Sequence, residues 1–158
     1  SARDGRGQRG EQARIGRGLL MGGQYEGAAL VYAEVLKRDP RNLSALTGRA
    51  AALHKLRQFG EARQLYQQAL SISPGNREVL SNLMAILGAE DPRQALEQLE
   101  QLHHDNPGFS PLPAQMASIY AQSGDLPTAI RFQSQAVQLS PENLLYRFNL
   151  AASYPIRC

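Results

Sequence analysis

The chain of 158 residues has one cysteine, Cys158, and no tryptophan. A single cysteine excludes an intramolecular disulfide framework and a zinc site built from several cysteines. No run of 18 or more apolar residues is present, so we predict no membrane span. No charged start followed by an apolar core marks a signal peptide. We therefore expect a cytoplasmic protein, or a periplasmic or envelope-associated one if the parent chain carries a signal or an anchor.

Motifs that mark enzymes are also missing. The sequence contains no GxSxG, P-loop or HExxH pattern. Gly5, Gly7 and Gly10 have the GxGxxG spacing, but no predicted strand precedes them, as a dinucleotide-binding motif requires. His103, His104 and Asp105 form the one metal-like cluster, but adjacent residues of a helix point about 100° apart. Charged histidines at a helix C-terminus also need no ligand, because they complement the helix dipole. We predict no enzymatic activity, no catalytic residue, no cofactor and no metal.

The formal net charge of +3 is modest, and part of it is local. Arg3, Arg6 and Arg9 alternate with glycines, which predicts a basic, disordered tail over residues 1–8. A basic tail can bind nucleic acid, but no aromatic side chains stand between these arginines to stack on bases. We therefore predict no specific nucleic-acid partner. Only two of the 17 basic residues, Lys37 and Lys55, are lysines, a bias that resembles chains from GC-rich bacteria.

What the sequence does have is a repeat. Prolines recur at intervals of 34, 33 and 34 residues, and an alanine stands twelve residues before each of them. A constant period of this length indicates stacked structural units that cannot bury their apolar faces alone. The prolines are Pro40, Pro74, Pro107 and Pro141, and the alanines are Ala28, Ala62, Ala95 and Ala129.

Within each period, the apolar residues are spaced as in two consecutive helices. In the second period, one apolar stripe runs from Leu43 to Leu56 and another from Ala62 to Ile72, and Pro74 prevents the second helix from continuing. Asp91 and Asp125 are predicted N-caps. The first helices are predicted near 9–21, 43–56, 77–88, 111–123 and 143–153, and the second helices near 25–38, 59–72, 92–104 and 126–139.

Together, these positions resemble the tetratricopeptide repeat. The signature of small, aromatic, alanine and proline positions is matched in the second period by Ala50, Leu53, Ala62, Tyr66, Ala69 and Pro74. In the fourth period, Gln133 stands at an aromatic position and Phe132 is displaced from it by one residue. The resemblance covers residues 9–154. It implies an all-α, right-handed α-solenoid of antiparallel helix pairs with about four and a half repeats: 9–42, 43–76, 77–109 (one residue short), 110–143, and a partial fifth repeat or capping helix over 144–158.

The resemblance also implies that the first helices line a concave groove. Asn82, Gln115 and Asn149 occupy the same repeat position and resemble the asparagine ladder of O-linked N-acetylglucosamine transferases, whose carboxamides can pair with peptide backbone. The alternative is that these three are ordinary surface residues of a Gln-rich protein. For His54, the sequence leaves open whether it is a groove residue or a packing residue. The residues predicted to bind a peptide are Arg14, Arg17, Thr47, His54, Ser81, Asn82, Gln115, Ser118, Gln122 and Asn149.

These features favour a non-catalytic scaffold that binds an extended peptide or partner protein in the groove. For bacterial proteins, the resemblance implies assembly or secretion complexes as the setting. Binding of chaperone C-terminal carboxylates is disfavoured, because Gly48 and Glu78 stand where that mode needs asparagine and lysine. One alternative is a homo-oligomer formed through the apolar last helix, which contains Phe148 and Tyr154. Another is the repeat arm of a larger transferase.

Overall fold

The computed structural model describes residues 2–154, with side chains from residue 7 onward; this part of the chain is helical and contains no strand. Residues 155–158, which include Pro155 and Cys158, lie outside the described residues. The chain divides into two compact units, residues 1–86 and 87–158. We call them the N-terminal and the C-terminal unit and describe each by itself. The all-α repeat fold predicted from the sequence is confirmed.

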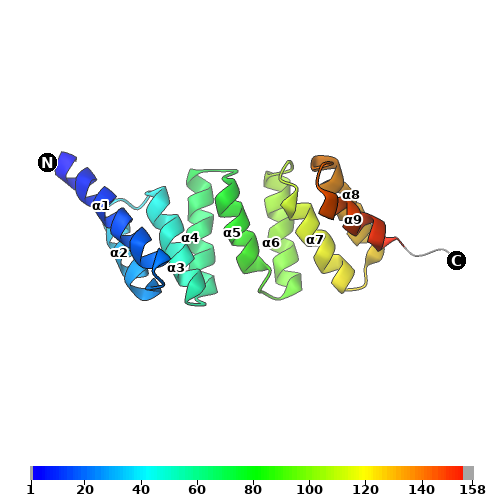
Figure 1. The fold of residues 1–158 in the computed structure, drawn as a ribbon, viewed down its shortest axis with the longest axis horizontal. Helices are drawn as coiled ribbons and strands as arrows, with labels where there is room; N and C mark the ends of the chain where they lie inside the picture. Colours follow the sequence, from blue (N-terminus) through cyan, green and yellow to red (C-terminus); the bar gives the residue numbers. More distant parts are fainter. Residues whose placement is uncertain (1, 155–158) are drawn as a thin grey trace. The chain divides into compact units, whose positions relative to one another are not determined.

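The N-terminal unit is built from α1 (Ala2–Met21), α2 (Tyr25–Arg38), α3 (Leu43–Lys55), α4 (Phe59–Ile72) and α5 (Arg77–Leu87), whose last residue belongs to the other unit. Helix α2 packs against α1 and α3, α3 packs against α4, and α1 also contacts α3 (Figure 1). The bounds of α2 to α5 agree with the predicted ranges to within one residue.

Helix α1 is longer than predicted. It begins at Ala2, so residues 2–8 are helical where we predicted a disordered tail. Adding residues to an existing helix costs much less than starting one, and the later part of α1 is held against α2. The Arg38 Nη1 of α2 also donates a hydrogen bond of 3.0 Å to the Gln8 side-chain oxygen. These contacts outweigh the cost of the glycines in the first turns, about 1 kcal/mol each.

Small residues fill the tightest positions of the N-terminal unit, as the sequence predicted. Ala28, Ala50 and Ala62 are completely buried. The large side chains of Tyr32 and Tyr66 are also buried, with exposed fractions of 3% and 1%. Buried alanines and buried aromatic rings thus occur together in this unit.

The helix ends of this unit follow simple local rules. The Asn42 side-chain oxygen accepts the backbone N–H of Ala45 at the start of α3, and Asn76 does the same at the start of α5. The turn after α1 uses Gly23 at φ +82°, a conformation that glycine adopts without strain. At the equivalent place after α3, the chain has Arg57 at φ +63°, with its guanidinium 5.5 Å from the centre of the Phe59 ring. An arginine therefore adopts a left-handed conformation that glycine would adopt at lower cost.

The C-terminal unit contains α6 (Pro92–Asp105), α7 (Pro111–Gln122), α8 (Leu126–Leu139) and α9 (Leu144–Ser153). Helix α7 packs against α6 and α8, and α8 packs against α9. Both predicted N-caps are confirmed: the Asp91 side chain accepts the backbone N–H of Arg93, and the Asp125 side chain accepts that of Thr128.

Gln133 replaces the buried aromatic side chain of the first two repeats by a polar one. It is 95% buried, and its Nε2 donates a hydrogen bond of 3.0 Å to the backbone carbonyl of Tyr146 in α9. The neighbouring Phe132 supplies an aromatic ring instead. It stacks on Tyr120 with ring centroids 5.6 Å apart and an angle of 4° between the rings. An aromatic ring is thus kept, one residue away from its usual position.

Helix α9 has an exposed apolar surface. None of its residues is fully buried, and several large apolar side chains are more than half exposed. The prediction of an apolar last helix is confirmed for the described residues. The exposed residues are Leu144, Leu145, Phe148 and, just after the helix, Tyr154.

Candidate functional site

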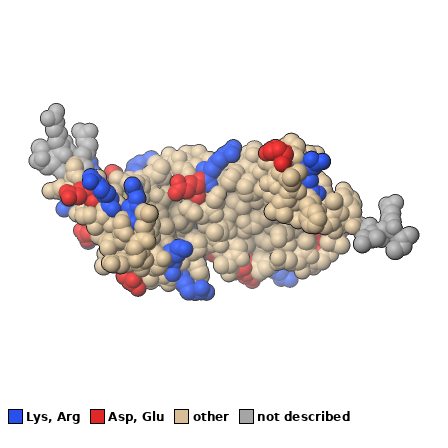
Figure 2. Space-filling model, in the orientation of Figure 1, with Lys and Arg blue, Asp and Glu red and all other residues tan. Residues whose placement is uncertain are grey.

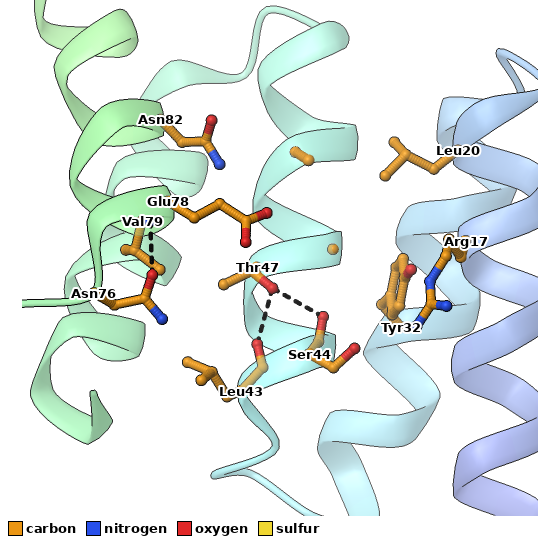
Figure 3. Close-up of a pocket in the computed structure, with 12 residues that line it drawn as sticks. Arg17, Leu20, Tyr32, Leu43, Ser44, Thr47, Asn76, Glu78, Val79 and Asn82 are labelled. Carbon is orange, nitrogen blue, oxygen red and sulfur yellow. Dashed lines mark hydrogen bonds between the residues drawn. The ribbon is translucent and has the colours of Figure 1, made fainter.

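A cavity of about 470 Å³ opens on the N-terminal unit, between the first helices of successive repeats (Figure 3). We call it the N-terminal groove. It is lined by residues of α1, α3 and α5, by the turn before α5, and by one side chain of α2. The lining residues are Arg17, Leu20, Tyr32, Leu43, Ser44, Thr47, Gly48, Ala51, Asn76, Glu78, Val79 and Asn82.

The floor of the groove is the α3 face that carries Ser44, Thr47, Gly48 and Ala51. These side chains are small, so a ligand can approach the helix backbone closely. The Thr47 hydroxyl lies 3.0 Å from the Leu43 carbonyl and 3.1 Å from the Ser44 carbonyl, and it donates to its own helix. Its proton is therefore occupied, while its oxygen remains able to accept a hydrogen bond.

Two glycines allow Tyr32 of α2 to reach the groove between α1 and α3. A Cβ atom built on Gly48 would lie 2.3 Å from the Tyr32 Cζ, and one built on Gly16 would lie 2.9 Å from it. No side chain fits at either position while the ring stays in place. Burial raises the pKa of the Tyr32 hydroxyl, and the positive charge of Arg17 beside it partly offsets this effect.

The walls of the groove carry charged and polar groups. Arg17 belongs to α1, whereas Glu78 and Asn82 belong to α5 and point toward α3 (Figure 3). Among the described residues, none of these three side chains makes a hydrogen bond or an ion pair. Arg17, Glu78 and Asn82 are therefore available to a ligand. The charge of Glu78 also acts on Tyr66: burial and this negative charge raise the pKa of Tyr66 to about 12.

Two models of the tetratricopeptide repeat match the chain, over residues 14–77 and 114–143. The chain is a tetratricopeptide repeat (TPR) protein. Repeats of this family are typical of scaffolds for protein–protein interaction. The signature positions that lie within these two ranges therefore mark true repeats.

Known proteins of the same family resemble this TPR protein over most of its length. It is 27% identical over 135 residues to "Interferon-induced protein with tetratricopeptide repeats 2" of Cricetulus griseus; the match covers 83% of the chain but only 29% of that relative. Its fold is similar to that of MamA, with a TM-score of 0.71, 17% identity, and 93% and 81% of the two chains covered. It is also similar to YrrB, described as a TPR protein with an unusual peptide-binding site, with a TM-score of 0.63, 20% identity, and 90% and 74% covered. A bacterial origin stays a prediction.

The predicted site residues of the TPR protein fall into two groups. Arg17, Thr47 and Asn82 line the N-terminal groove, whereas Arg14 and Ser81 are exposed on α1 and α5 without lining it. The remaining predicted residues lie outside this groove. Gln115, Ser118 and Gln122 are on α7, Asn149 is on α9, and His54 is near the end of α3.

His54 does not line the N-terminal groove. Its ring packs edge-on against Phe59 with centroids 5.6 Å apart. Burial, together with the charge of Lys55, lowers the pKa of His54. Of the two interpretations open from the sequence, the packing residue fits this contact.

The carboxamide ladder stays a prediction. Asn82 belongs to the N-terminal unit, and Gln115 and Asn149 belong to the C-terminal unit. Nine of the twelve lining residues were not among those predicted to bind a peptide. They include Tyr32, which comes from a second helix, and Leu43, Asn76 and Val79 at the starts of α3 and α5.

The charged surface of the TPR protein is mixed. On the face drawn in Figure 2, basic and acidic side chains are scattered among uncharged ones and form no continuous basic patch. Within the described part of the chain, no three His, Cys, Asp or Glu residues are placed to hold a metal ion. The same part has no helix that is both long enough and apolar enough to cross a membrane.

Proposed function

We propose that the N-terminal groove binds an extended segment of a partner protein. The observation that carries this proposal is the cavity between α1, α3 and α5, with a floor of small residues and unpaired polar groups on its walls. Its volume of about 470 Å³ lies in the range of roughly 300–1,000 Å³ that is usual for ligand pockets. The peptide-binding site named for YrrB, a protein of similar fold, supports a peptide as the ligand.

An extended chain fits this groove better than a helix. The backbone N–H and C=O groups of an extended peptide are free, whereas those of a helix are largely paired within it. Asn82 offers both a donor and an acceptor, and Ser44 offers an exposed hydroxyl group on the floor. In this proposal, Asn82 is the first member of the carboxamide ladder, which Gln115 and Asn149 would continue.

Filling the groove tests the proposal. We expect Ser44→Trp to weaken binding of a peptide selected from a random library by about tenfold or more, because the indole would occupy the floor. Gln67→Trp, at an exposed position of α4 outside the cavity, is the matched control and should leave affinity unchanged. Fluorescence anisotropy of the labelled peptide measures both. Equal affinity of the two variants would show that the groove is not the binding site.

The ladder has its own test. If it contributes, Asn82→Ala combined with Asn149→Ala weakens binding of the same peptide, and an unchanged affinity rejects the ladder without rejecting the groove. Roles in a bacterial assembly or secretion complex, or as the repeat arm of a larger transferase, stay predictions about the whole protein.

Self-association through α9 is a second candidate function, favoured by its exposed apolar residues. We expect the average mass measured by light scattering to rise with protein concentration, and Phe148→Asp to abolish that rise. Leu30→Asp is the matched control, since Leu30 of α2 and Phe148 both have an exposed fraction of 69%. A protein that stays monomeric at high concentration would exclude this function.

A further inference from the structure

The two walls of the N-terminal groove carry opposite charges. Arg17 projects from α1 on one side of the floor, and Glu78 projects from α5 on the other (Figure 3). Both side chains are exposed, and neither has an ion-pair partner among the described residues. A free charge on each wall attracts ligand groups of the opposite sign.

The chemistry of each wall favours a particular ligand group. The planar guanidinium of Arg17 suits a carboxylate, which it can bind through two parallel hydrogen bonds. On the other wall, Asn82 lies one turn after Glu78 on the same face of α5. A lysine or arginine side chain can therefore meet the Glu78 carboxylate and the Asn82 carbonyl oxygen together.

The same arrangement disfavours polyanions. A nucleic-acid strand or an anionic lipid surface would satisfy Arg17 but would bring negative charge to Glu78. A polypeptide is the ligand class that carries both signs at a short spacing.

We propose that the N-terminal groove selects peptide segments with one acidic and one basic side chain, the acidic one at Arg17 and the basic one at Glu78 and Asn82. This inference rests on the proposed function and gives it a ligand class. The floor helix with its side chains is about 10–12 Å across, and an extended chain advances about 3.3 Å per residue. The two charges should therefore be about three to four residues apart.

Reversing the charge of one wall at a time tests the selection. Four labelled peptides would share one backbone sequence and carry, at the two charged positions, aspartate and lysine, two aspartates, two lysines, or two neutral residues. We expect the natural protein to bind the aspartate–lysine peptide about threefold to fivefold tighter than the like-charged peptides, since exposed ion pairs contribute little each. Arg17→Glu should then prefer the peptide with two lysines, and Glu78→Arg the peptide with two aspartates.

The control is Arg41→Glu, which makes the same charge change at an exposed position between α2 and α3, outside the cavity. This variant should bind the four peptides in the same order of affinity as the natural protein at an ionic strength of about 0.15 M, where the screening length is about 8 Å. Arg17→Gln and Glu78→Gln, which remove a charge without reversing it, should each lose the preference for the matching residue. Circular dichroism would verify that every variant is folded.

The outcomes separate this inference from the proposed function. Suppose that peptides bind, that Ser44→Trp weakens their binding, and that neither charge reversal changes the order of their affinities. The groove then binds peptides but does not select them by charge, so the inference is wrong. If Ser44→Trp has no effect, the groove is not the site and both proposals fail. A change of order in the two directions given above supports both.

Discussion

Gly48→Ala is expected to destabilise the N-terminal unit by about 1–3 kcal/mol, the usual cost of overpacking a close contact. An added Cβ would lie 2.3 Å from the Tyr32 Cζ, well inside van der Waals contact. The ring cannot simply move away, because Gly16 already lies close to it on the α1 side. Urea unfolding measured by circular dichroism gives the change in free energy.

Gly18→Ala is the matched control for this change. Gly18 lies within α1, and a Cβ atom there would meet nothing within 4 Å. Because alanine favours a helix over glycine by about 1 kcal/mol, this variant should be as stable as the natural protein or more so. Tyr32→Leu combined with Gly48→Ala should cost less than the sum of the single changes, since the smaller side chain removes the clash. If Gly48→Ala matches Gly18→Ala, the ring does not hold the position described here.

Ala62→Leu is the second change for which we expect a large effect, again a loss of about 1–3 kcal/mol. Ala62 is completely buried in α4. Its three equivalents are also buried, with exposed fractions of 0%, 1% and 2% at Ala28, Ala95 and Ala129. Thermal and urea unfolding would both show the loss. Ala121→Leu, at an exposed position of α7, adds the same atoms without overpacking and should leave the stability nearly unchanged. A variant at Ala62 that unfolds like the natural protein would mean that this helix contact has spare room.

The helix pairs could be predicted because the same pattern of apolar residues, alanine and proline recurs in successive repeats. Each pair has its own apolar stripes and its own buried alanine, as at Ala28 and Ala62. A helix that is predicted poorly from one repeat can therefore be located from the equivalent positions of the others. The start of α1 could not be predicted, because its glycine-rich composition favours disorder and only contacts such as Arg38 to Gln8 counter it.

The groove could be predicted only in part. Arg17 and Asn82 follow from the repeat position alone. Tyr32 does not, because its ring reaches the groove only where two glycines far apart in sequence, Gly16 and Gly48, come together in space. His54 occupies a groove position in the repeat, but contact with Phe59 decides where its ring lies.

The single amide of Gln133 that reaches the Tyr146 carbonyl has a consequence for how the C-terminal unit comes apart. Since α9 has no fully buried residue, detaching it sacrifices few apolar contacts, while its loss leaves a polar group of α8 to be hydrated. Regions with few buried contacts open first and at low free energy. Helix α9 should therefore detach before the other helices of this unit, and its backbone amides should exchange with solvent while those helices remain folded.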